Sequence, residues 1–214
     1  MPLKCASSLW SADMSNLAAE IRRVEPYSDR FHIDVCDGHY APVLLFFPDL
    51  VRAARPHTSK PFEVHLGCTD PLAWVKPFRE AGADGAIFYF DSTREPQKVI
   101  DAIRDAGMYV GISLTLDEPI ELAQPYIKQL DVLTIMGTAA AIKGAGMDPR
   151  VPDKIRAARR IIEMHRSRTE IEADGGIREQ TVPVIAEAGA DWIVPGSLMF
   201  AQPPERLMRL IASH

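Results

Sequence analysis

Apolar residues along this chain follow two patterns that alternate from one end to the other. Short apolar runs such as "GAIFYF" and "YVGISL" are typical of buried strands, and the segments between the runs repeat apolar residues every three or four positions, as amphipathic helices do. The runs predict strands at 3–8, 31–35, 62–65, 85–90, 109–114, 132–136, 170–173 and 192–194. The periodic segments predict helices at 13–24, 50–55, 71–81, 97–106, 120–126, 153–166, 179–188 and 204–212. Alternation of this kind favours a parallel sheet.

A weak internal repeat indicates how that sheet is organised. The sequence "EAGAD" occurs at 80–84 and at 187–191, and "DAGMY" at 105–109 is a weaker copy. We expect Gly82, Gly107 and Gly189 to end helices in the left-handed conformation. One strand plus one helix takes about 25 residues, and about eight such units fit the chain. The prediction is therefore one α/β domain, residues 1–214, folded as a (β/α)8 TIM barrel. Neither GxGxxG nor GxxxxGK[ST] occurs, which disfavours an open sheet.

The composition argues against some classes of binding partner. Of 214 residues, 47% are hydrophobic and 25% are charged, close to the averages for a soluble globular domain. The net charge of −5 and the lack of a basic block argue against nucleic-acid binding. No uncharged apolar stretch approaches the length of a membrane span, and the N-terminus lacks a signal-peptide pattern. We expect a cytoplasmic protein without a membrane partner. Three cysteines without CxxC spacing argue against a disulfide framework and a structural zinc site.

Polar residues gather where barrel enzymes keep their catalytic groups, at the carboxyl ends of the strands. His32 and Asp34 share one face of a strand because side chains alternate, so Phe31, Ile33 and Val35 are expected to face outward. His65 and Asp174 close two further strands. One such histidine alone would more often be a hydrogen-bonded core residue. Two imidazoles and two carboxylates at equivalent strand ends favour one divalent ion: zinc, iron, manganese or cobalt.

Glycines after the last two strands indicate a phosphate site. "DGGI" at 174–177 contains Gly175 and Gly176, and "PGS" at 195–197 contains Gly196 and Ser197. Backbone N–H groups in these two loops often hold phosphate in barrel enzymes, although either motif alone is weak evidence.

Other polar residues have simpler interpretations. We expect Asp37 to cap or brace the turn after the second strand. Glu63 and Glu172 lie two residues before His65 and Asp174, on the same inward face. They either orient the metal ligands or form an ion pair with Lys4 lower in the barrel.

A run of motifs covers nearly the whole chain: "SSLWSADM", "FHIDVCDGHYAP", "FEVHL", "LTIM", "IEADGGI" and "AEAGADWIVPGSLMF". In order and spacing it resembles ribulose-phosphate 3-epimerase and its allulose-6-phosphate relatives. The resemblance implies metal ligands at His32, Asp34, His65 and Asp174, and it implies that the two aspartates serve as base and acid. It also implies a substrate contact at Ser8 and a methionine near the metal at Met136. The implied reaction inverts C3 of a ketose phosphate through an enediolate.

The chain departs from that family in its loops. The glycine-rich loop after the sixth predicted strand is replaced by "AAAIKGAG" at 139–146, where only Gly144 matches a family glycine and Lys143 can supply charge instead. Tyr89 stands where a histidine is common. The apolar segment "VLLFF" at 43–47 either narrows the substrate pocket or forms a contact between subunits, and we expect a homo-oligomer.

Two other functions fit the same barrel. An isomerase or lyase would use the enediolate differently, and product analysis would reveal it. The DxKxxD pattern of related decarboxylases and synthases is missing, because "HIDVCDG" has no lysine. A sugar-phosphate-binding paralogue without catalysis would not need acid and base groups on two faces of its ligand.

Overall fold

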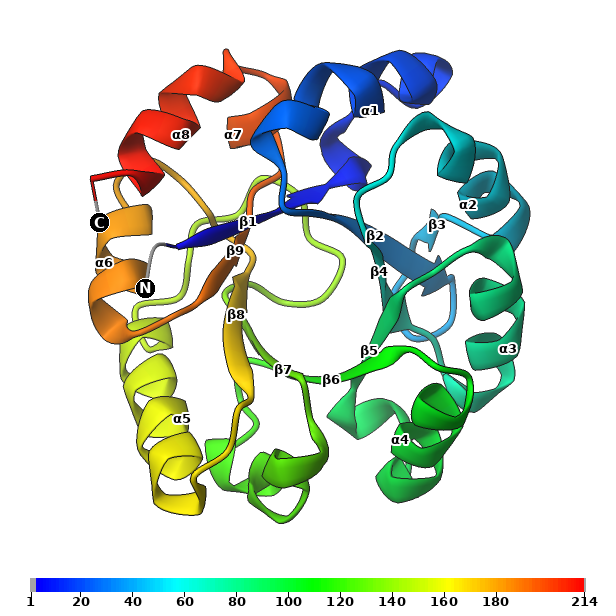
Figure 1. Cartoon of the computed structure of the whole chain (residues 1–214). Helices are drawn as coiled ribbons and strands as arrows, with labels where there is room; N and C mark the ends of the chain where they lie inside the picture. The colour runs from blue at the N-terminus through cyan, green and yellow to red at the C-terminus, as the bar shows by residue number, and fades with distance from the viewer. Residues whose placement is uncertain (1–2, 214) are drawn as a thin grey trace.

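The computed structural model describes residues 3–213, and residues 1, 2 and 214 lie outside the described part. Eight parallel strands form a closed barrel, and Figure 1 looks into this ring with the helices outside it. The ring runs β1-β9-β8-β7-β6-β5-β4-β2 and closes between β1 and β2. The strands are β1 Lys4–Ser8, β2 Arg30–Asp37, β4 Phe62–Gly67, β5 Gly85–Tyr89, β6 Tyr109–Leu114, β7 Val132–Met136, β8 Glu170–Asp174 and β9 Trp192–Val194. The predicted (β/α)8 barrel is confirmed.

Apart from α7 (Ser197–Phe200), the α-helices follow the predicted segments with shifts at their ends. They are α1 Leu17–Val24, α2 Pro48–Ala54, α3 Leu72–Ala81, α4 Pro96–Asp105, α5 Val151–His165, α6 Val182–Ala188, α7 Ser197–Phe200 and α8 Pro204–Ile211. The segment Ile120–Gln129, η6, is a 3-10 helix rather than the expected α-helix. Pro125 inside it has no N–H for an α-helical hydrogen bond. The four-residue helix α7 was not predicted, because it is too short to show a period.

The repeated "EAGAD" motif has a structural role at both of its ends. Gly82 and Gly189 end α3 and α6 at φ values of 103° and 102°, as predicted, and Gly107 has φ 73°. The aspartate that closes each copy accepts a backbone N–H from the preceding strand of the barrel: Asp84 from Phe62 at 2.8 Å, and Asp191 from Ile171 at 2.7 Å. The motif therefore ends a helix and fixes the start of two strands.

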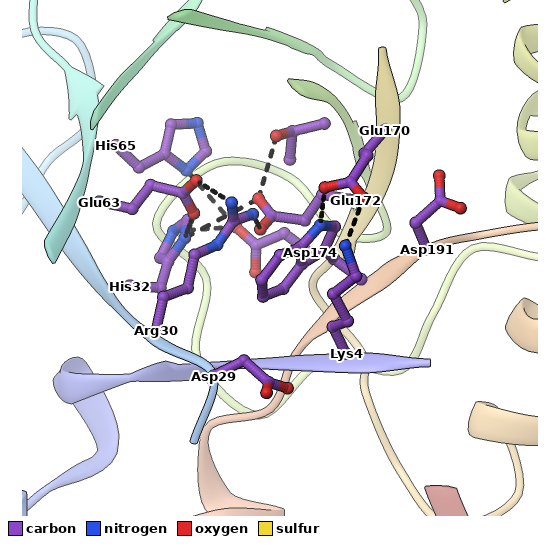
Figure 2. A network of polar contacts seen from close by, with 12 residues as sticks. Lys4, Asp29, Arg30, His32, Glu63, His65, Glu170, Glu172, Asp174 and Asp191 are labelled. Atoms are coloured by element: carbon purple, nitrogen blue, oxygen red, sulfur yellow. Dashed lines mark hydrogen bonds and ion pairs between the residues drawn. The ribbon is translucent and has the colours of Figure 1, made fainter. Parts of the chain in front are cut away.

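Side chains alternate across the barrel wall as the sequence predicted. Phe31, Ile33 and Val35 pack outward into the layer between strands and helices, at most 4% exposed. His32 and Asp34 point inward from the same strand (Figure 2 labels His32). The three cysteines are free; two are buried and Cys36 is half-buried.

The segment 43–47 forms a feature that was not predicted. Leu44–Leu45 is a short strand, β3, which pairs antiparallel with Cys36 and Asp37 at the end of β2. Leu44 is 79% exposed and Phe47 is 57% exposed, beside an apolar pocket of about 620 Å³. The segment does not line the cavity that contains Asp34 and Asp174, so it does not narrow that cavity. Of the helices in residues 3–213, none combines the length and apolar character that crossing a membrane requires.

Candidate functional site

A cavity of about 300 Å³ opens at the carboxyl ends of the strands. Asp34 and Asp174 line it. So does each residue that was predicted to contact substrate: Ser8, Met136, Gly144, Gly175, Gly176, Gly196 and Ser197. His32 and His65 lie beside the two aspartates and are 0% and 2% exposed. The fold therefore brings together all the site residues that were predicted from the sequence.

Four side chains at the base of this cavity, which we call the mouth cluster, are His32, Asp34, His65 and Asp174. The Nε2 atom of His32 lies 3.6 Å from Asp34 Oδ1 and 3.7 Å from Asp174 Oδ2. The Nδ1 atom of His65 lies 3.5 Å from Asp174 Oδ2. One ligand atom from each of the four residues can be chosen so that all lie within 4.8 Å of one another.

The mouth cluster fits a divalent ion. Ligand atoms 2.0–2.2 Å from a common zinc ion lie at most about 4.4 Å apart, so the observed spacing needs only small adjustments. The Nε2 atom of His32, which faces both aspartates, is buried and has no hydrogen-bond partner among the described residues. Unpaired buried nitrogens of this kind are costly unless a ligand satisfies them. Two imidazoles with two carboxylates form a donor set for borderline divalent metals.

His32 is held in one orientation from the side away from the cavity. Its Nδ1 atom lies 3.0 Å from Glu63 Oε1, so Nδ1–H donates to a carboxylate and Nε2 faces the two aspartates. Burial alone would lower the pKa of His32, but Asp34, Glu63 and Asp174 outweigh burial and raise that pKa well above 6.5. The site therefore attracts positive charge, whether a proton or a metal ion.

The two aspartates flank His32 from different strands. Asp34 comes from β2 and Asp174 from β8, which are separated in the barrel wall by β1 and β9. Ser8 donates from its Oγ to Asp34 Oδ2 at 2.7 Å. Burial opposes ionisation of Asp34, but His32 and the hydrogen bond from Ser8 lower its pKa below 3.8. Asp34 is thus a carboxylate positioned to accept a proton.

Below the mouth cluster lies a second group of polar side chains, which we call the floor network: Lys4, Arg30, Glu63, Glu170, Glu172 and Trp192. In Figure 2, Arg30 and Glu63 lie beside His32, and Lys4 lies beside Glu170. Arg30 pairs with both Glu63 and Glu172, while Lys4 pairs with Glu170. The alternative that Lys4 neutralises Glu63 and Glu172 is therefore wrong.

The position of Arg30 also has a consequence for metal binding. His32, Glu63 and Glu172 meet the same spacing criterion for an ion as the mouth cluster does. The Arg30 guanidinium already contacts both of these carboxylates, so the floor network carries its own cation.

Tyr89 closes one side of the mouth cluster. Its ring stacks on His65 with centroids 4.5 Å apart, and its hydroxyl donates to the Met136 sulfur at 3.7 Å. Burial and the nearby Asp174 carboxylate raise the pKa of Tyr89 well above 10, so the hydroxyl remains protonated.

The loops over the cavity contain its only two basic lining residues among the described part of the chain, Lys143 and Arg178. Lys143 donates to the Trp10 carbonyl at 3.0 Å and thereby links two loops across the cavity. Arg178 donates to the Ile177 carbonyl at 2.8 Å. Neither side chain is paired with a carboxylate of the described residues. The cavity is therefore acidic at its base and basic at its rim.

Backbone geometry explains one of the predicted glycines. A Cβ atom on Gly176 would lie 2.4 Å from the Met147 backbone nitrogen. The φ angle of Gly176 is 71°, which side-chain-bearing residues rarely adopt. The segments that contain Gly176 and Met147 can therefore meet only if residue 176 is a glycine.

Sequence reasoning missed several residues that line or support the cavity: Trp10, Arg30, Thr138 and Arg178. Arg30 was detectable in principle, since it precedes His32 by two positions and so shares its inward face. Trp10 lies in a three-residue 3-10 helix, and Thr138 and Arg178 lie in loops, so none of these segments shows a period.

Comparisons with known proteins show which family this chain resembles over most of its length. A model of the family described as "Ribulose-phosphate 3 epimerase family" matches residues 4–200. The chain is 34% identical to the cytoplasmic isoform of ribulose-phosphate 3-epimerase from Oryza sativa subsp. japonica, over 97% of this chain and 92% of that protein. It is 33% identical to ribulose-phosphate 3-epimerase from Bacillus subtilis, over 94% of this chain and 93% of that one.

Solved structures show the same fold at lower identity. A crystal structure of KGPDC from Streptococcus mutans, determined as a complex, has a TM-score of 0.75 at 16% identity, and the match covers 99% of this chain and 96% of that one. A 3-hexulose-6-phosphate synthase gives a TM-score of 0.70, also at 16% identity, and covers 100% of this chain and 99% of that one.

Proposed function

The chain belongs to the ribulose-phosphate 3-epimerase family and is an isomerase, and from this premise we propose that it is a metal-dependent 3-epimerase of a phosphorylated ketose. The substrate class is ribulose 5-phosphate, xylulose 5-phosphate or a related ketose phosphate. One observation carries the proposal: two carboxylates from different strands flank the unpaired Nε2 atom of His32 in one cavity, at 3.6 and 3.7 Å.

The two carboxylates supply the proton transfers that inversion at C3 requires. The C3 proton is acidic because it is next to the C2 carbonyl. Asp34, ionised and held by Ser8, takes this proton from one face of the substrate. Asp174 returns a proton to the opposite face, which inverts the centre, and the roles reverse for the other direction. A divalent ion held by His32, Asp34, His65 and Asp174 would supply Lewis-acid stabilisation of the negative charge of the enediolate.

The opposite end of the cavity suits the phosphate. Lys143 and Arg178 supply positive charge at the rim, while both acidic lining residues lie at the base. A neutral sugar chain with one anionic end matches this polarity. The same cavity is also lined by Gly175, Gly176, Gly196 and Ser197. The fit of charge supports a phosphorylated substrate over a free sugar.

Proton NMR in D2O tests the proposal. Protein loaded with zinc, iron, manganese or cobalt in turn is incubated with a panel of ketose phosphates and with the matching unphosphorylated ketoses. We expect deuterium to enter C3 of at least one ketose phosphate, accompanied by its C3 epimer. No exchange in any phosphorylated member with any of the four metals would overturn the epimerase, and a different product would favour an isomerase or lyase.

A further inference from the structure

A buried arginine next to the site has no explanation in the proton transfers. Arg30 is 4% exposed and lies on β2, two residues before His32 and on the same inward face. Its Nη1 atom is 2.9 Å from Glu63 Oε2, and its Nη2 atom donates to Glu172 Oε2. Figure 2 shows Arg30 beside His32 and the two glutamates.

Each of these glutamates uses one oxygen for Arg30 and directs the other toward His32. Glu63 Oε1 lies 3.0 Å from His32 Nδ1. Glu172 Oε1 lies 3.9 Å from the same nitrogen and also accepts from Thr134 Oγ1 at 3.0 Å. A single guanidinium thus fixes both carboxylates that face the ring of His32 from below.

Aromatic rings hold the guanidinium itself in place. Its central carbon lies 3.8 Å from the centroid of Trp192 and 5.6 Å from that of Tyr109. Trp192 in turn donates from Nε1 to Glu170 Oε2 at 2.6 Å. A flat cation held against aromatic rings keeps its two ends in a fixed direction, which a lysine cannot do.

Stability alone does not account for this arrangement. Buried ion pairs are often no more stabilising than apolar side chains of similar volume. What distinguishes Arg30 is its position. Arg30 contacts Glu63, and Glu63 contacts the Nδ1 atom of His32, whose Nε2 atom faces the two aspartates.

We propose that Arg30 is a positioning residue for His32: through Glu63 and Glu172 it sets the direction of the His32 ring and so the affinity of the mouth cluster for a divalent ion. The inference rests on the metal site of the proposed function. Losing the partner that orients a metal-bound histidine typically weakens metal binding by about 10- to 100-fold.

The test measures metal binding directly, with Co²⁺ as the probe. Arg30→Lys keeps the charge but loses the flat, two-ended guanidinium. Arg55→Lys is the matched control, since Arg55 also stacks at 3.8 Å on a ring, that of Phe62, and pairs with Asp84 at 3.1 Å. The dissociation constant is obtained by competition with a chromophoric chelator. The visible spectrum of bound Co²⁺ reports the ligand geometry.

We expect Arg30→Lys to raise the dissociation constant by about 10-fold or more and to change the Co²⁺ spectrum, while Arg55→Lys matches the unsubstituted protein. The double variant Arg30→Met with Glu172→Gln removes one buried charge of each sign; it provides the same comparison if the lysine variant does not fold, with the same expected loss. If the dissociation constant of the folded Arg30 variant for Co²⁺ stays within about twofold of the control and its Co²⁺ spectrum is unchanged, this proposal fails while the metal site stands. An unsubstituted protein that binds none of the four metals overturns both.

Discussion

The mouth cluster and the floor network are both polar groups inside one barrel, but they differ in how their charges are balanced. Each charged side chain of the floor network has a partner of opposite sign within the barrel. The mouth cluster combines two carboxylates with two imidazoles, and no arginine or lysine among the described residues pairs with either carboxylate. Burying an unbalanced charge costs free energy, so a fold keeps one where a ligand or a reaction uses it. The mouth cluster thus leaves its negative charge for a ligand, whereas the charges of the floor network balance one another.

The sharpest test of this contrast removes one charge from the mouth cluster without changing its shape. We expect Asp34→Asn and Asp174→Asn each to lower kcat by about 10³-fold or more, because an amide neither accepts nor returns the C3 proton. Deuterium exchange at C3 provides the measurement, and circular dichroism checks that the barrel is folded. A near-normal rate in either variant would refute the two-carboxylate mechanism.

Metal binding by the mouth cluster should depend strongly on pH. The carboxylates raise the pKa of His32 above 6.5, so its proton persists to higher pH and competes with the ion there. We expect the affinity for Zn²⁺ to rise up to about tenfold per pH unit between about pH 6 and about pH 8. Calorimetry in buffers of different ionisation enthalpy measures the protons released. A pH-independent affinity without proton release would contradict this account of His32.

The basic rim of the cavity should affect binding more than turnover. We expect Lys143→Met and Arg178→Met each to raise KM for a ketose phosphate by about tenfold with little change in kcat, since in the proposed function they bind the phosphate end of the substrate, which does not react. Lys98→Met is the control, because Lys98 is exposed and pairs with Glu95 outside the cavity. Equal losses of kcat and of kcat/KM would instead place these cations in the chemical step.

A change in the outer part of the floor network should affect stability alone. Glu170 pairs with Lys4 and accepts the Trp192 N–H, and Glu170→Gln keeps an oxygen for Trp192. We expect the free energy of unfolding to fall by about 1 kcal/mol, with metal affinity and kcat unchanged. Urea denaturation and a Zn²⁺ titration measure the two effects. A marked loss of metal affinity would show that the two regions are less separate than the contacts indicate.

Asp37 tests whether a carboxylate takes its role from its position near the cavity or from the hydrogen bonds that satisfy its charge. It lies at the end of β2 near the cavity, but it accepts backbone N–H groups from His39, Tyr40 and Thr69, so the expected turn brace is present. Burial opposes ionisation, yet these hydrogen bonds lower its pKa from 3.8 to about 2. Its stabilising effect is complete above pH 3.8 and is lost as the pH falls through about 2.

We therefore expect Asp37→Asn to be slightly less stable than the unsubstituted protein near neutral pH, and this difference to vanish toward about pH 2. Unfolding curves at several pH values measure it. If the difference grew as the pH fell, the lowered pKa would be wrong.

Much of the barrel follows from local periodicity, and the agreement is closest where the period is strongest. The bounds of β6 and β7 match the prediction, because both are largely apolar runs without a charged residue or a proline. The strand β3 was missed because two residues show no alternation. The helix expected at 120–126 is a 3-10 helix, since the proline within it overrides an otherwise amphipathic pattern.

The sequence by itself determined that His32, Asp34, His65 and Asp174 lie on the inward faces of their strands, because alternation within a strand is a local property of the backbone. Only the tertiary structure decided which distant side chains meet. It paired Arg30 with Glu63 and Glu172 rather than leaving these glutamates to Lys4, and it brought Lys143 to the Trp10 carbonyl. Those contacts depend on closure of the barrel and on the paths of its loops. No period along the chain encodes either of them.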